Sequence, residues 1–329
     1  MKYSYLKFKT WLNNYKSDDG RIYFMRFLPP SINKVYADFK LFVDKKRGYP
    51  KLKALFNKRI GYKLNLDNPR SFNEKIIWKK LYDRNPLLTV TADKYEVRGY
   101  LKNILGDEEA DKLIVPVYYV TSDPHKIPFS QLPDRFVIKP NHGSRMHIIH
   151  KGDKPVCREY IQRKCKEWLR TNYGFYHYEW AYRNIKRKII LEELLETGDG
   201  SLPMDYKFYC FNSKCRLIRV SDNRFGSDDN SAYLDIEWNL LPVVNPGYNS
   251  ENIEFKKPAN PDYLINLAEK ISADFDAVRV DFYYCDGRAF FSELTHYDGS
   301  GLARFEPESF DFELGSFWKI LPEYWKRKN

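Results

Sequence analysis

The 329-residue sequence predicts an α+β fold with antiparallel sheets. From about residue 113, short runs rich in apolar and β-branched residues predict strands: "LIVPVYYV", "RFVIKP", "HIIHK", "KIILEEL", "KFYCF", "CRLIRV" and the pair in "VRVDFYYCDGRAFFSEL". Helical patterns such as "CREYIQRKCKEWLRTNY" and "PDYLINLAEKISADF" lie between these strands. Strand pairs that alternate with helices are typical of the α+β class.

Residues 1–88 predict a helical extension ahead of the strands. Tyr5, Phe8, Leu12 and Tyr15 recur at helical spacing with lysines between them. Two consecutive prolines then separate this run from a second one, "INKVYADFKLFVDKK". We therefore expect at least two helices before residue 50.

A third helix is predicted at "SFNEKIIWKKLY". Ser71 and Glu74 have the S-x-x-E spacing of a capping box, in which each side chain bonds the other residue's backbone N–H. The apolar positions Phe72, Ile76 and Leu81 suit a helix that docks on a larger body.

The basic charge of the chain lies in its N-terminal part. Residues 1–90 hold 21 Lys and Arg against 7 Asp and Glu, a net charge of +14, whereas the remaining 34 and 37 give −3. A solvated helical face is one explanation, and a surface for anionic lipid or polyanionic glycan is another. Rings and lysines interleave as in an interfacial helix: Tyr3, Tyr5, Phe8, Trp11 and Leu12 with Lys2, Lys7 and Lys9. We expect no nucleic-acid partner, because no recognised binding fold accompanies the charge.

The totals predict a soluble cytoplasmic protein of two or three packed units. Apolar residues make up 43% and charged residues 30%, no apolar run approaches the roughly 20 residues of a membrane span, and the N-terminus lacks a signal-peptide core. The odd number of cysteines and the absence of C-x-x-C argue against disulfides and zinc. The nearby His142, His147 and His150 lack the spacing of a metal site.

Two acids lie inside the apolar strand pair, Asp281 and Glu293. Burying an unpaired carboxylate costs several kcal/mol, so each needs a cation. A two-residue turn at Asp286 and Gly287 would leave the acids on opposite faces, because the strand period is two. A three-residue loop, with Gly287 at the positive-φ position, would place Arg279 with both acids on one face. That arrangement predicts a Mg²⁺ site; the alternative is a solvated hairpin edge with two unrelated acids.

Three further motifs have both a functional and an ordinary explanation. In "FVIKPNHGSRMHIIH", Lys139 ends a strand and a Gly143-Ser144 loop could cradle phosphate, but Gly-Ser hairpins are common. "KIILEELLE", at 188–196, reads equally as a strand that presents its backbone to adenine or as a short amphipathic helix. "TADKYEVRGYL", at 91–101, opens a helix with a charged pair that needs no function.

The order of these four motifs resembles the ATP-grasp superfamily over about residues 90 to 305, with "VRVDFYYCDGRAFFSELTHYDGSG" similar to its metal-binding strand pair. More narrowly, "NPRSFNEKIIWKKLYDRNP", "DKYEVRGYL", "IKPNHGS" and "DYKFYCF" resemble the ATP-grasp subfamily named for teichuronopeptide biosynthesis, which is associated with bacterial surface polysaccharides. The resemblance covers nearly all of the chain after roughly residue 50. It implies two α+β lobes that clasp ATP: residues 89–200 with the nucleotide lid and residues 201–329 with the metal site, after the 1–88 extension.

The resemblance also implies roles for individual residues. Lys94 and Lys139 would hold the ATP phosphates and Arg279 would neutralise the transferring phosphoryl group. The remaining nucleotide-binding positions would be Gly143 and Ser144 in the loop, Glu192 or Glu193 with the backbone of Leu194 or Leu195 at the adenine hinge, and Lys207. Asp281, Glu293 and Thr295 would bind Mg²⁺. Thr295 stands where the superfamily usually has Asn, and "HYDGSG" replaces the usual Pro-Gly, which makes a second metal less certain.

The function implied by the resemblance is ATP-dependent carboxylate–amine ligation through an acyl phosphate. The expected substrates are a carboxylate-bearing sugar of a surface polysaccharide or its precursor, such as a uronic acid, and an amino acid or other amine. Alternatives are a sugar phosphotransferase on the same fold and a non-catalytic adaptor for glycan or membrane. Contact of residues 1–16 with the inner face of the membrane would place the enzyme near lipid-linked precursors.

Overall fold

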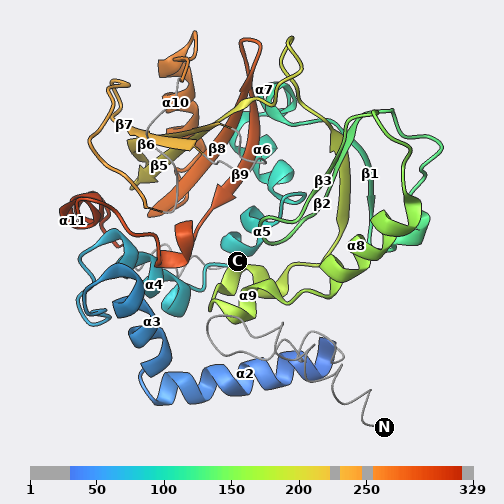
Figure 1. The fold of residues 1–329 in the computed structure, drawn as a ribbon. Coiled ribbons are helices and arrows are strands. Elements are labelled where there is room, and N and C mark those ends of the chain that lie inside the picture. The colour runs from blue at the N-terminus through green and yellow to red at the C-terminus, as the bar shows by residue number, and fades with distance from the viewer. Residues whose placement is uncertain (1–29, 223–229, 247–254, 321–329) are drawn as a thin grey trace.

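The computed structural model describes residues 30–222, 230–246 and 255–320. It contains two antiparallel sheets surrounded by helices, which confirms the predicted α+β class (Figure 1). The predicted helical run from Tyr5 to Tyr15, and the whole segment 1–16, lie outside the described residues. Among the described residues, no helix is both long and apolar enough to cross a membrane.

The described part of the chain begins with the helices α2 (Pro30–Lys46), α3 (Pro50–Ile60) and α4 (Phe72–Tyr82). The predicted capping box of α4 is present. The Glu74 backbone N–H donates to Ser71 Oγ over 3.1 Å, and the Ser71 N–H donates to the Glu74 carboxylate over 3.2 Å. Phe72, Ile76 and Leu81 are buried as predicted, so α4 docks firmly on the rest of the molecule.

The other helical elements connect or flank the sheets. In chain order they are α5 (Leu87–Ala92), α6 (Val97–Leu105), α7 (Asp107–Leu113), η2 (Pro124–Lys126), α8 (Arg158–Arg170), α9 (Tyr173–Tyr176), η3 (Trp180–Asn184), α10 (Pro261–Ile271), η4 (Asp298–Gly301) and α11 (Ser309–Ser316). The sequence had predicted α8 and α10 from their apolar periodicity.

The smaller sheet has the strand order β1-β4-β2-β3. Its strands are β1 (Val117–Thr121), β2 (Phe136–Pro140), β3 (Ile148–His150) and β4 (Ile189–Glu193). Ile189, Ile190 and Leu191 are all fully buried, so successive side chains of β4 are covered on both faces of the sheet. The helical alternative for 188–196 is therefore wrong, and the strand interpretation holds.

The larger sheet has the order β7-β6-β5-β8-β9. Its strands are β5 (Met204–Phe211), β6 (Lys214–Asp222), β7 (Asn230–Leu234), β8 (Ala277–Cys285) and β9 (Arg288–Thr295). The strand β7 was not predicted. It is a short run, and it forms the edge of the sheet beside β6.

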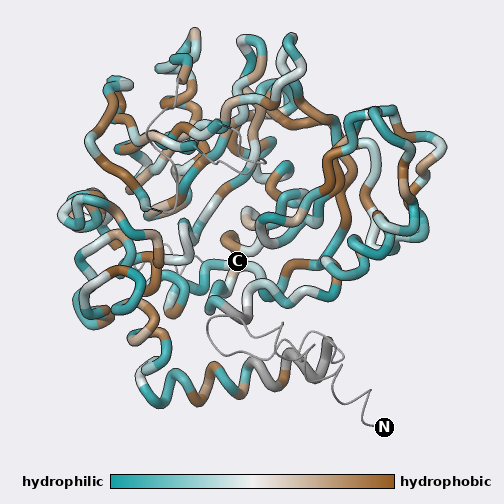
Figure 2. The backbone as a smooth tube through the Cα atoms, viewed as in Figure 1, coloured by the Kyte–Doolittle hydropathy of each residue, from teal (hydrophilic) through white to brown (hydrophobic). Residues whose placement is uncertain are grey.

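The two faces of the larger sheet differ in chemistry. On one face Phe208, Ile218 and Val280 join the main hydrophobic core, to which α6 and α10 also contribute. The other face carries a row of directly paired residues that crosses all five strands: Tyr233, Arg219, Lys207, Asp281 and Glu293. Figure 2 shows hydrophobic stretches, coloured brown, within the strands of both sheets. A row of charges across a buried sheet needs internal partners, and it marks the candidate site.

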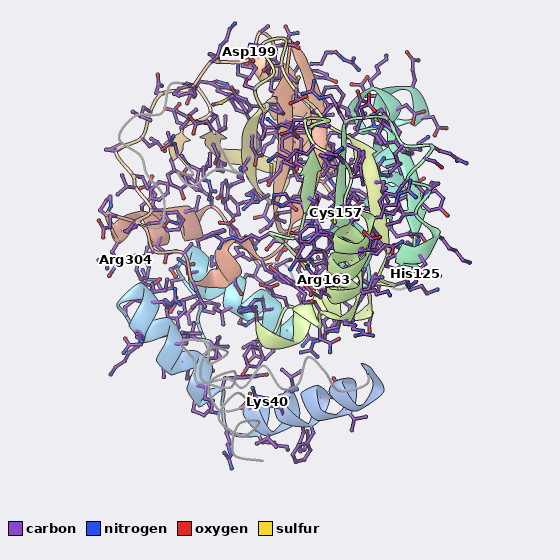
Figure 3. The ribbon with its side chains drawn as sticks, turned by 45° about the vertical axis from the view of Figure 1, so that its right-hand side comes forward. Lys40, His125, Cys157, Arg163, Asp199 and Arg304 are labelled. Atoms are coloured by element: carbon purple, nitrogen blue, oxygen red, sulfur yellow. The ribbon has the colours of Figure 1, made fainter. Side chains whose placement is uncertain are left out.

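The cysteines are free thiols, as predicted. Cys157, labelled in Figure 3, is exposed, and the other four are buried. Burial raises the pKa of the Cys165 thiol to about 12, so it stays protonated and unreactive. The four buried cysteines pack as small apolar side chains.

Candidate active site

The hairpin of β8 and β9 turns at Asp286 and Gly287, because Cys285 pairs with Arg288 on either side of these two residues. The two turn residues have φ angles of 48° and 81°. Positive φ at both central positions defines the type I′ turn, for which Asp-Gly is a favoured sequence. The predicted three-residue loop is therefore wrong.

A β-bulge nevertheless brings the two acids together. Asp281 pairs directly with Glu293, and the register then shifts because Ser292 is an extra residue in β9. Directly paired residues share a face, and Arg279, paired with Thr295, lies on the same face. The predicted grouping of these side chains is thus present, produced by a bulge within the strand instead of by the length of the turn.

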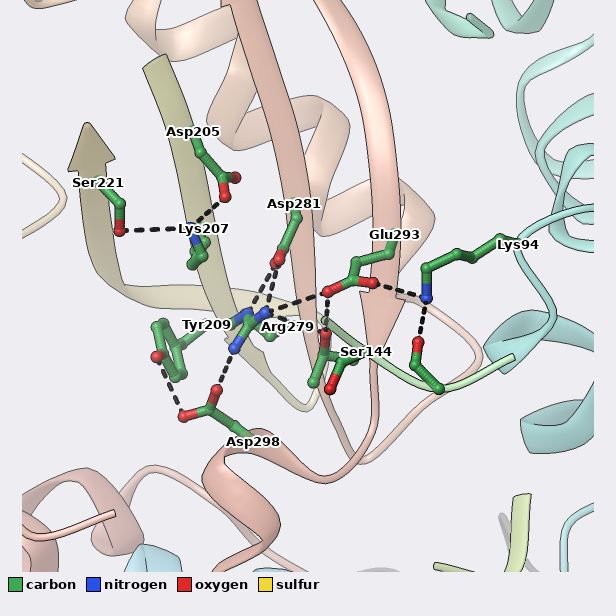
Figure 4. Close-up of polar contacts among 12 residues, drawn as sticks. Lys94, Ser144, Asp205, Lys207, Tyr209, Ser221, Arg279, Asp281, Glu293 and Asp298 are labelled. Atoms are coloured by element: carbon green, nitrogen blue, oxygen red, sulfur yellow. Dashed lines mark hydrogen bonds and ion pairs between the residues drawn. The ribbon is translucent and has the colours of Figure 1, made fainter. Parts of the chain in front are cut away.

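Arg279 is the centre of the buried cluster (Figure 4). Its guanidinium donates to both oxygens of Asp281, over 2.7 and 2.6 Å, and to Thr295 Oγ1 over 3.0 Å. It also binds Asp298 at the start of η4, and Tyr209 donates to the other Asp298 oxygen over 3.2 Å. Bidentate pairing of this kind fixes the orientation of the guanidinium.

Burial controls the protonation of this cluster. Asp281 is 0% exposed, and desolvation raises the pKa of its carboxyl to about 6, although the Arg279 charge lowers it. Burial would lower the pKa of Arg279, but Asp281 and Asp298 together raise it well above the ordinary value. Arg279 therefore remains charged, and Asp281 loses its proton most readily when a cation is close.

Lys94 connects this cluster to the other lobe. Its Nζ lies 3.0 Å from Glu293 Oε2 and donates to the Gly143 carbonyl over 2.8 Å. Glu293 Oε1 lies 3.6 Å from Arg279 Nη2. Lys94 and Gly143, which are predicted to bind phosphate, thus lie next to Glu293, which is predicted to bind the metal.

The glycine loop is held in place by Asn141. Its amide donates to Asp93 over 2.7 Å, and its side-chain oxygen accepts from the Lys188 N–H over 2.7 Å. Asp93 also accepts from the backbone N–H groups of Tyr95 and Glu96, so this acid has a structural role next to Lys94.

Gly143 itself requires the absence of a side chain. Its φ is +73°, and a Cβ atom there would lie 2.7 Å from the ring of Tyr173. The next residue, Ser144, shares a 2.8 Å hydrogen bond with the Tyr173 hydroxyl. Beside it, burial lowers the pKa of His142 to about 3, so this imidazole is neutral.

Lys139 lies on β2 and pairs with Glu192 of β4. Glu192 is buried, and its second oxygen lies 3.4 Å from Arg98 Nη2. Glu192, a predicted hinge acid, therefore forms ion pairs with Lys139 and Arg98. The strand ends at Glu193, and Leu194 and Leu195 follow it. Leu195 packs beside Val115, Cys285 and Phe290.

Lys207 lies on β5 directly opposite Asp281. Its ammonium binds Asp205 over 2.5 Å and lies 3.4 Å from Ser221 Oγ. Lys207 and Asp205 are both almost fully buried. The lysine thus provides a fixed positive charge beside the acids of β8 and β9.

Sequence reasoning did not identify Asp205 and Asp298 as members of the site. Asp205 was visible in "DYKFYCF", two residues before Lys207 on the same face of a strand. Asp298 was visible in "HYDGSG", where the chain departs from the Pro-Gly of the superfamily. The departure supplies a second carboxylate for Arg279.

The oxygen donors at this site suit a divalent cation. Four carboxylates (Asp205, Asp281, Glu293 and Asp298) lie among four side-chain cations (Lys94, Lys207, Arg219 and Arg279). Within the described ranges, no three His, Cys, Asp or Glu side chains gather into a closed metal site. Mg²⁺ prefers one or two carboxylates and completes its shell with nucleotide phosphates and water, which suits an open pair of acids.

The paired antiparallel sheets and the charged site between their lobes define an ATP-grasp protein. A model of the family described as TupA-like ATPgrasp matches residues 74–319, well over half of the chain. The chain belongs to this family, which confirms the predicted resemblance.

Several solved structures are similar at low sequence identity. The ATP-grasp ligase PsnB with its minimal precursor is 14% identical, with 64% of this chain and 54% of PsnB covered and a TM-score of 0.36. D-alanine-D-alanine ligase from Helicobacter pylori is 12% identical, with 77% and 70% covered and a TM-score of 0.41. D-cycloserine synthetase DcsG is 15% identical, with 70% and 71% covered and a TM-score of 0.39. The chain thus spans about half the length of PsnB. No curated protein matches the sequence.

Proposed function

We propose that the protein is an ATP-dependent carboxylate–amine ligase that forms an amide through an acyl phosphate. One observation carries this proposal: Lys94 joins the glycine loop of one lobe to Glu293 of the other, beside the Arg279 and Asp281 pair. Cations and acids from two lobes therefore converge where a γ-phosphate and its metal would lie.

The chemistry requires activation because a carboxylate is anionic and its oxygen is a poor leaving group. Transfer of the γ-phosphoryl group converts that oxygen into phosphate, which an amine can displace. Phosphoryl transfer needs positioning and charge stabilisation more than covalent participation by the protein. A site made of fixed cations and carboxylates supplies both.

The roles proposed for the residues are those that the family resemblance implies. Lys94 and Lys139 hold the ATP phosphates, and Gly143 and Ser144 close over them. Arg279 stabilises the charge that develops on the transferring group. Lys207 is a further phosphate ligand beside Asp281.

The adenine binds at the end of β4. Glu192 or Glu193 begins this hinge, and the backbone of Leu194 or Leu195 contacts the base. Glu192 acts in part by fixing Lys139, which it already binds.

Asp281, Glu293 and Thr295 would hold Mg²⁺. The ion, when bound, neutralises phosphate charge and aligns the γ-phosphate for transfer. Arg279 already binds both Asp281 and Thr295, so it holds these oxygen donors together on one face. The direct pairing of Asp281 with Glu293 presents carboxylates from two adjacent strands.

The proposed substrates are a uronic acid of a bacterial surface polysaccharide or its precursor and an amino acid or other amine. The association of the TupA-like family with surface polysaccharides supports this choice. An adaptor function without catalysis is disfavoured, since the site keeps a full set of paired cations and acids.

The test is a panel of uronic acids and amines incubated with ATP and Mg²⁺. A ligase releases ADP and inorganic phosphate and forms an amide, which mass spectrometry detects. Production of ADP and a phosphorylated sugar without free phosphate would identify a phosphotransferase instead. No turnover with any acid would contradict both.

We also propose that the enzyme is cytoplasmic and docks peripherally on the inner face of the membrane. Residues 1–16 carry the interleaved rings and lysines. On α2, Val35, Phe39 and Phe42 share one face and are 70%, 64% and 58% exposed. Lysines on this helix, such as Lys40 (Figure 3), add charge that suits anionic lipid.

Vesicle flotation tests this docking. The full chain should bind anionic vesicles at low salt, and removal of residues 1–16 should weaken the binding. Salt should weaken it too, since exposed charges are screened over about 10 Å at 0.1 M. Phe39→Ser with Phe42→Ser should have a similar effect. Indifference of the full chain to anionic vesicles at low salt would overturn the docking.

A further inference from the structure

The charged row on the larger sheet extends beyond the residues that have a role in the proposed function. Lys207 of β5 pairs directly with Arg219 of β6, and Arg219 pairs directly with Tyr233 of β7, so all three share the face that carries Asp281. Arg219 is 6% exposed. A buried guanidinium thus lies one strand beyond the lysine of the candidate site.

Lys207 and Arg219 are like charges in directly opposed positions. Side chains at such positions have Cβ atoms about 4.5–5.5 Å apart, and like charges there repel. Asp205, on the same strand as Lys207, binds its ammonium over 2.5 Å. An anion placed above β5 and β6 contacts both cations at once, so this part of the sheet suits a negatively charged ligand.

The strand register places Arg219 close to the reaction centre. Tyr209 pairs directly with Arg279 on β8 and lies diagonally across from Arg219 on β6, and such diagonal neighbours are about 7–8 Å apart. The Tyr209 hydroxyl donates to Asp298, which also binds Arg279. Burial raises the pKa of this hydroxyl well above its ordinary value, whereas the charges of Arg219 and Arg279 lower it. The two arginines therefore lie on either side of one tyrosine.

The glycine loop lies at the opposite end of the row. Lys94 contacts both Glu293 on β9 and the Gly143 carbonyl of that loop. From β9 inward, one residue per strand, the row runs Glu293, Asp281, Lys207 and Arg219. Neighbouring strands lie about 4.8 Å apart, so Arg219 is about 10 Å from Asp281 along the row. The row thus presents two acids first, then a lysine, then an arginine.

This order matches the order of the groups that react in a ligation. In an in-line transfer the attacking oxygen lies opposite the leaving ADP, and it must come within about 3–3.5 Å of the γ-phosphorus. The acid substrate therefore has to lie on the side of Lys207 away from the glycine loop, where Arg219 is. A guanidinium binds both oxygens of a carboxylate in a fixed geometry.

The residues around Arg219 suit a sugar acid. Ser221, two residues further along β6, pairs directly with Ser231 of β7, and both are buried on the same face as Arg219. Their hydroxyls are donors and acceptors for the hydroxyl groups of a sugar. Tyr233 packs its ring against Phe305 with centroids 5.8 Å apart, so the charged row ends at an apolar boundary.

We infer that Arg219 binds the carboxylate of the acid substrate and holds it beside Lys207, facing the γ-phosphoryl group. The inference rests on the proposed ligase function and assigns the subsite for its acid. The guanidinium and the carboxylate form a bidentate pair, and the Ser221 and Ser231 hydroxyls bind the sugar ring.

The test uses the uronic acid that the wild type converts fastest, with D-glucuronate and D-galacturonate as the first probes. Arg219→Gln should raise the KM for this acid about tenfold to a hundredfold, because a charged hydrogen-bonded pair is lost, and should leave the KM for ATP within about twofold. Arg216→Gln is the matched control. Arg216 lies on the same strand, is exposed and packs beside Phe317, so neither KM should change.

Binding gives a readout that does not depend on turnover. The same acid should raise the melting temperature of the wild type loaded with MgADP. Arg219→Gln should lose this shift while it keeps the shift that MgADP itself causes. An acid-dependent shift of equal size in both proteins would make Arg219 a structural residue, and so would an unchanged KM for the acid.

Arg219→Lys covers the case in which the glutamine variant does not fold, because lysine keeps the charge but cannot form the bidentate pair. Its KM for the acid should rise about threefold to tenfold with kcat nearly unchanged, and a wild-type KM in this variant would contradict the inference. If the wild type converts uronic acids and the variants bind them equally well, only the role of Arg219 is refuted. If the wild type neither converts nor binds any acid, the ligase proposal fails and the inference falls with it.

Discussion

Two buried clusters in this protein each place one cation between two carboxylates. In the first, Lys79 of α4 lies 2.7 Å from Asp83 and 2.6 Å from Asp276. In the second, Arg279 binds Asp281 and Asp298. By residue type and burial the clusters are nearly equivalent.

They differ in how their remaining hydrogen-bonding capacity is used. Around Lys79, Asp276 accepts from the Trp318 indole over 3.0 Å and the Ala277 N–H over 2.8 Å, and Asp83 accepts from the Asn85 N–H over 2.9 Å. Backbone and indole donors thus complete this cluster inside the protein. It resembles a buried ion network that joins α4 to the larger sheet.

The Arg279 cluster is open on one side. Glu293 adds a further carboxylate with a side chain 15% exposed, and its partner Lys94 is equally exposed and reaches into the glycine loop. Charge that is open to solvent on one side can be reached by a ligand, whereas the charges around Lys79 are satisfied inside the protein. Both clusters carry one more carboxylate than cations, so the accessible charge of Glu293 and Lys94 is what distinguishes the candidate site from the structural cluster.

The largest expected effect is the loss of the closed cluster. Lys79→Met leaves Asp83 and Asp276 without their cation, and breaking a buried pair costs about 3–5 kcal/mol. Urea unfolding should show this loss in the free energy of unfolding, while the exposed Lys58→Met serves as control. A change below about 1 kcal/mol would mean that the two acids are protonated in the native state.

In the open cluster the main effect should fall on catalysis. Glu293→Gln removes the acid that joins the lobes, and Lys139→Ala removes a phosphate cation. Either change should lower ATP turnover on the order of 10²-fold, about 2.7 kcal/mol, with little change in melting temperature. Turnover close to wild type in one of these variants would withdraw the role assigned to that residue.

The effect of MgADP on the free energy of unfolding should further distinguish the two clusters. MgADP at ten times its Kd should raise the free energy of unfolding of the wild type by about 1.4 kcal/mol. Asp281→Asn should abolish this increase, and Lys79→Met, although less stable, should retain it. Calorimetric melting with and without MgADP measures both. Stabilisation of Asp281→Asn equal to that of the wild type would remove this acid from the metal site.

The sequence predicted much of the open cluster because its chemistry is local. Arg279 and Asp281 have the two-residue spacing that puts side chains on one face of a strand, and the resemblance placed Lys94 and Lys139 near them. The bulge at Ser292 could not be predicted, since bulges depend on how two strands pair and not on either strand alone. A two-residue turn at Asp286 and Gly287 was considered and rejected, because without a bulge it would leave the two acids on opposite faces.

The closed cluster was not predicted at all. Asp276 is distant from Lys79 in the sequence, and only the packing of α4 against the start of β8 brings them together. The same holds for Lys80 and Ser300, which are distant in the sequence and form hydrogen bonds in the fold. Long-range pairing of this kind leaves no spacing pattern in a single sequence.

The smallest expected effect compares one carboxylate from each cluster. Asp298→Asn keeps a hydrogen bond to Arg279 but removes a charge, so Arg279 is less firmly oriented toward the transferring phosphoryl group. We expect kcat to fall about threefold to tenfold, up to about 1.4 kcal/mol, with a nearly unchanged KM for ATP. Asp83→Asn makes the same chemical change beside Lys79 and should lower the melting temperature without changing kcat. Steady-state kinetics and thermal melts of the two variants give a direct comparison. If Asp83→Asn lowered kcat as much as Asp298→Asn, the closed cluster would belong to the catalytic machinery, and the distinction between structural and functional clusters drawn from accessible charge would be wrong.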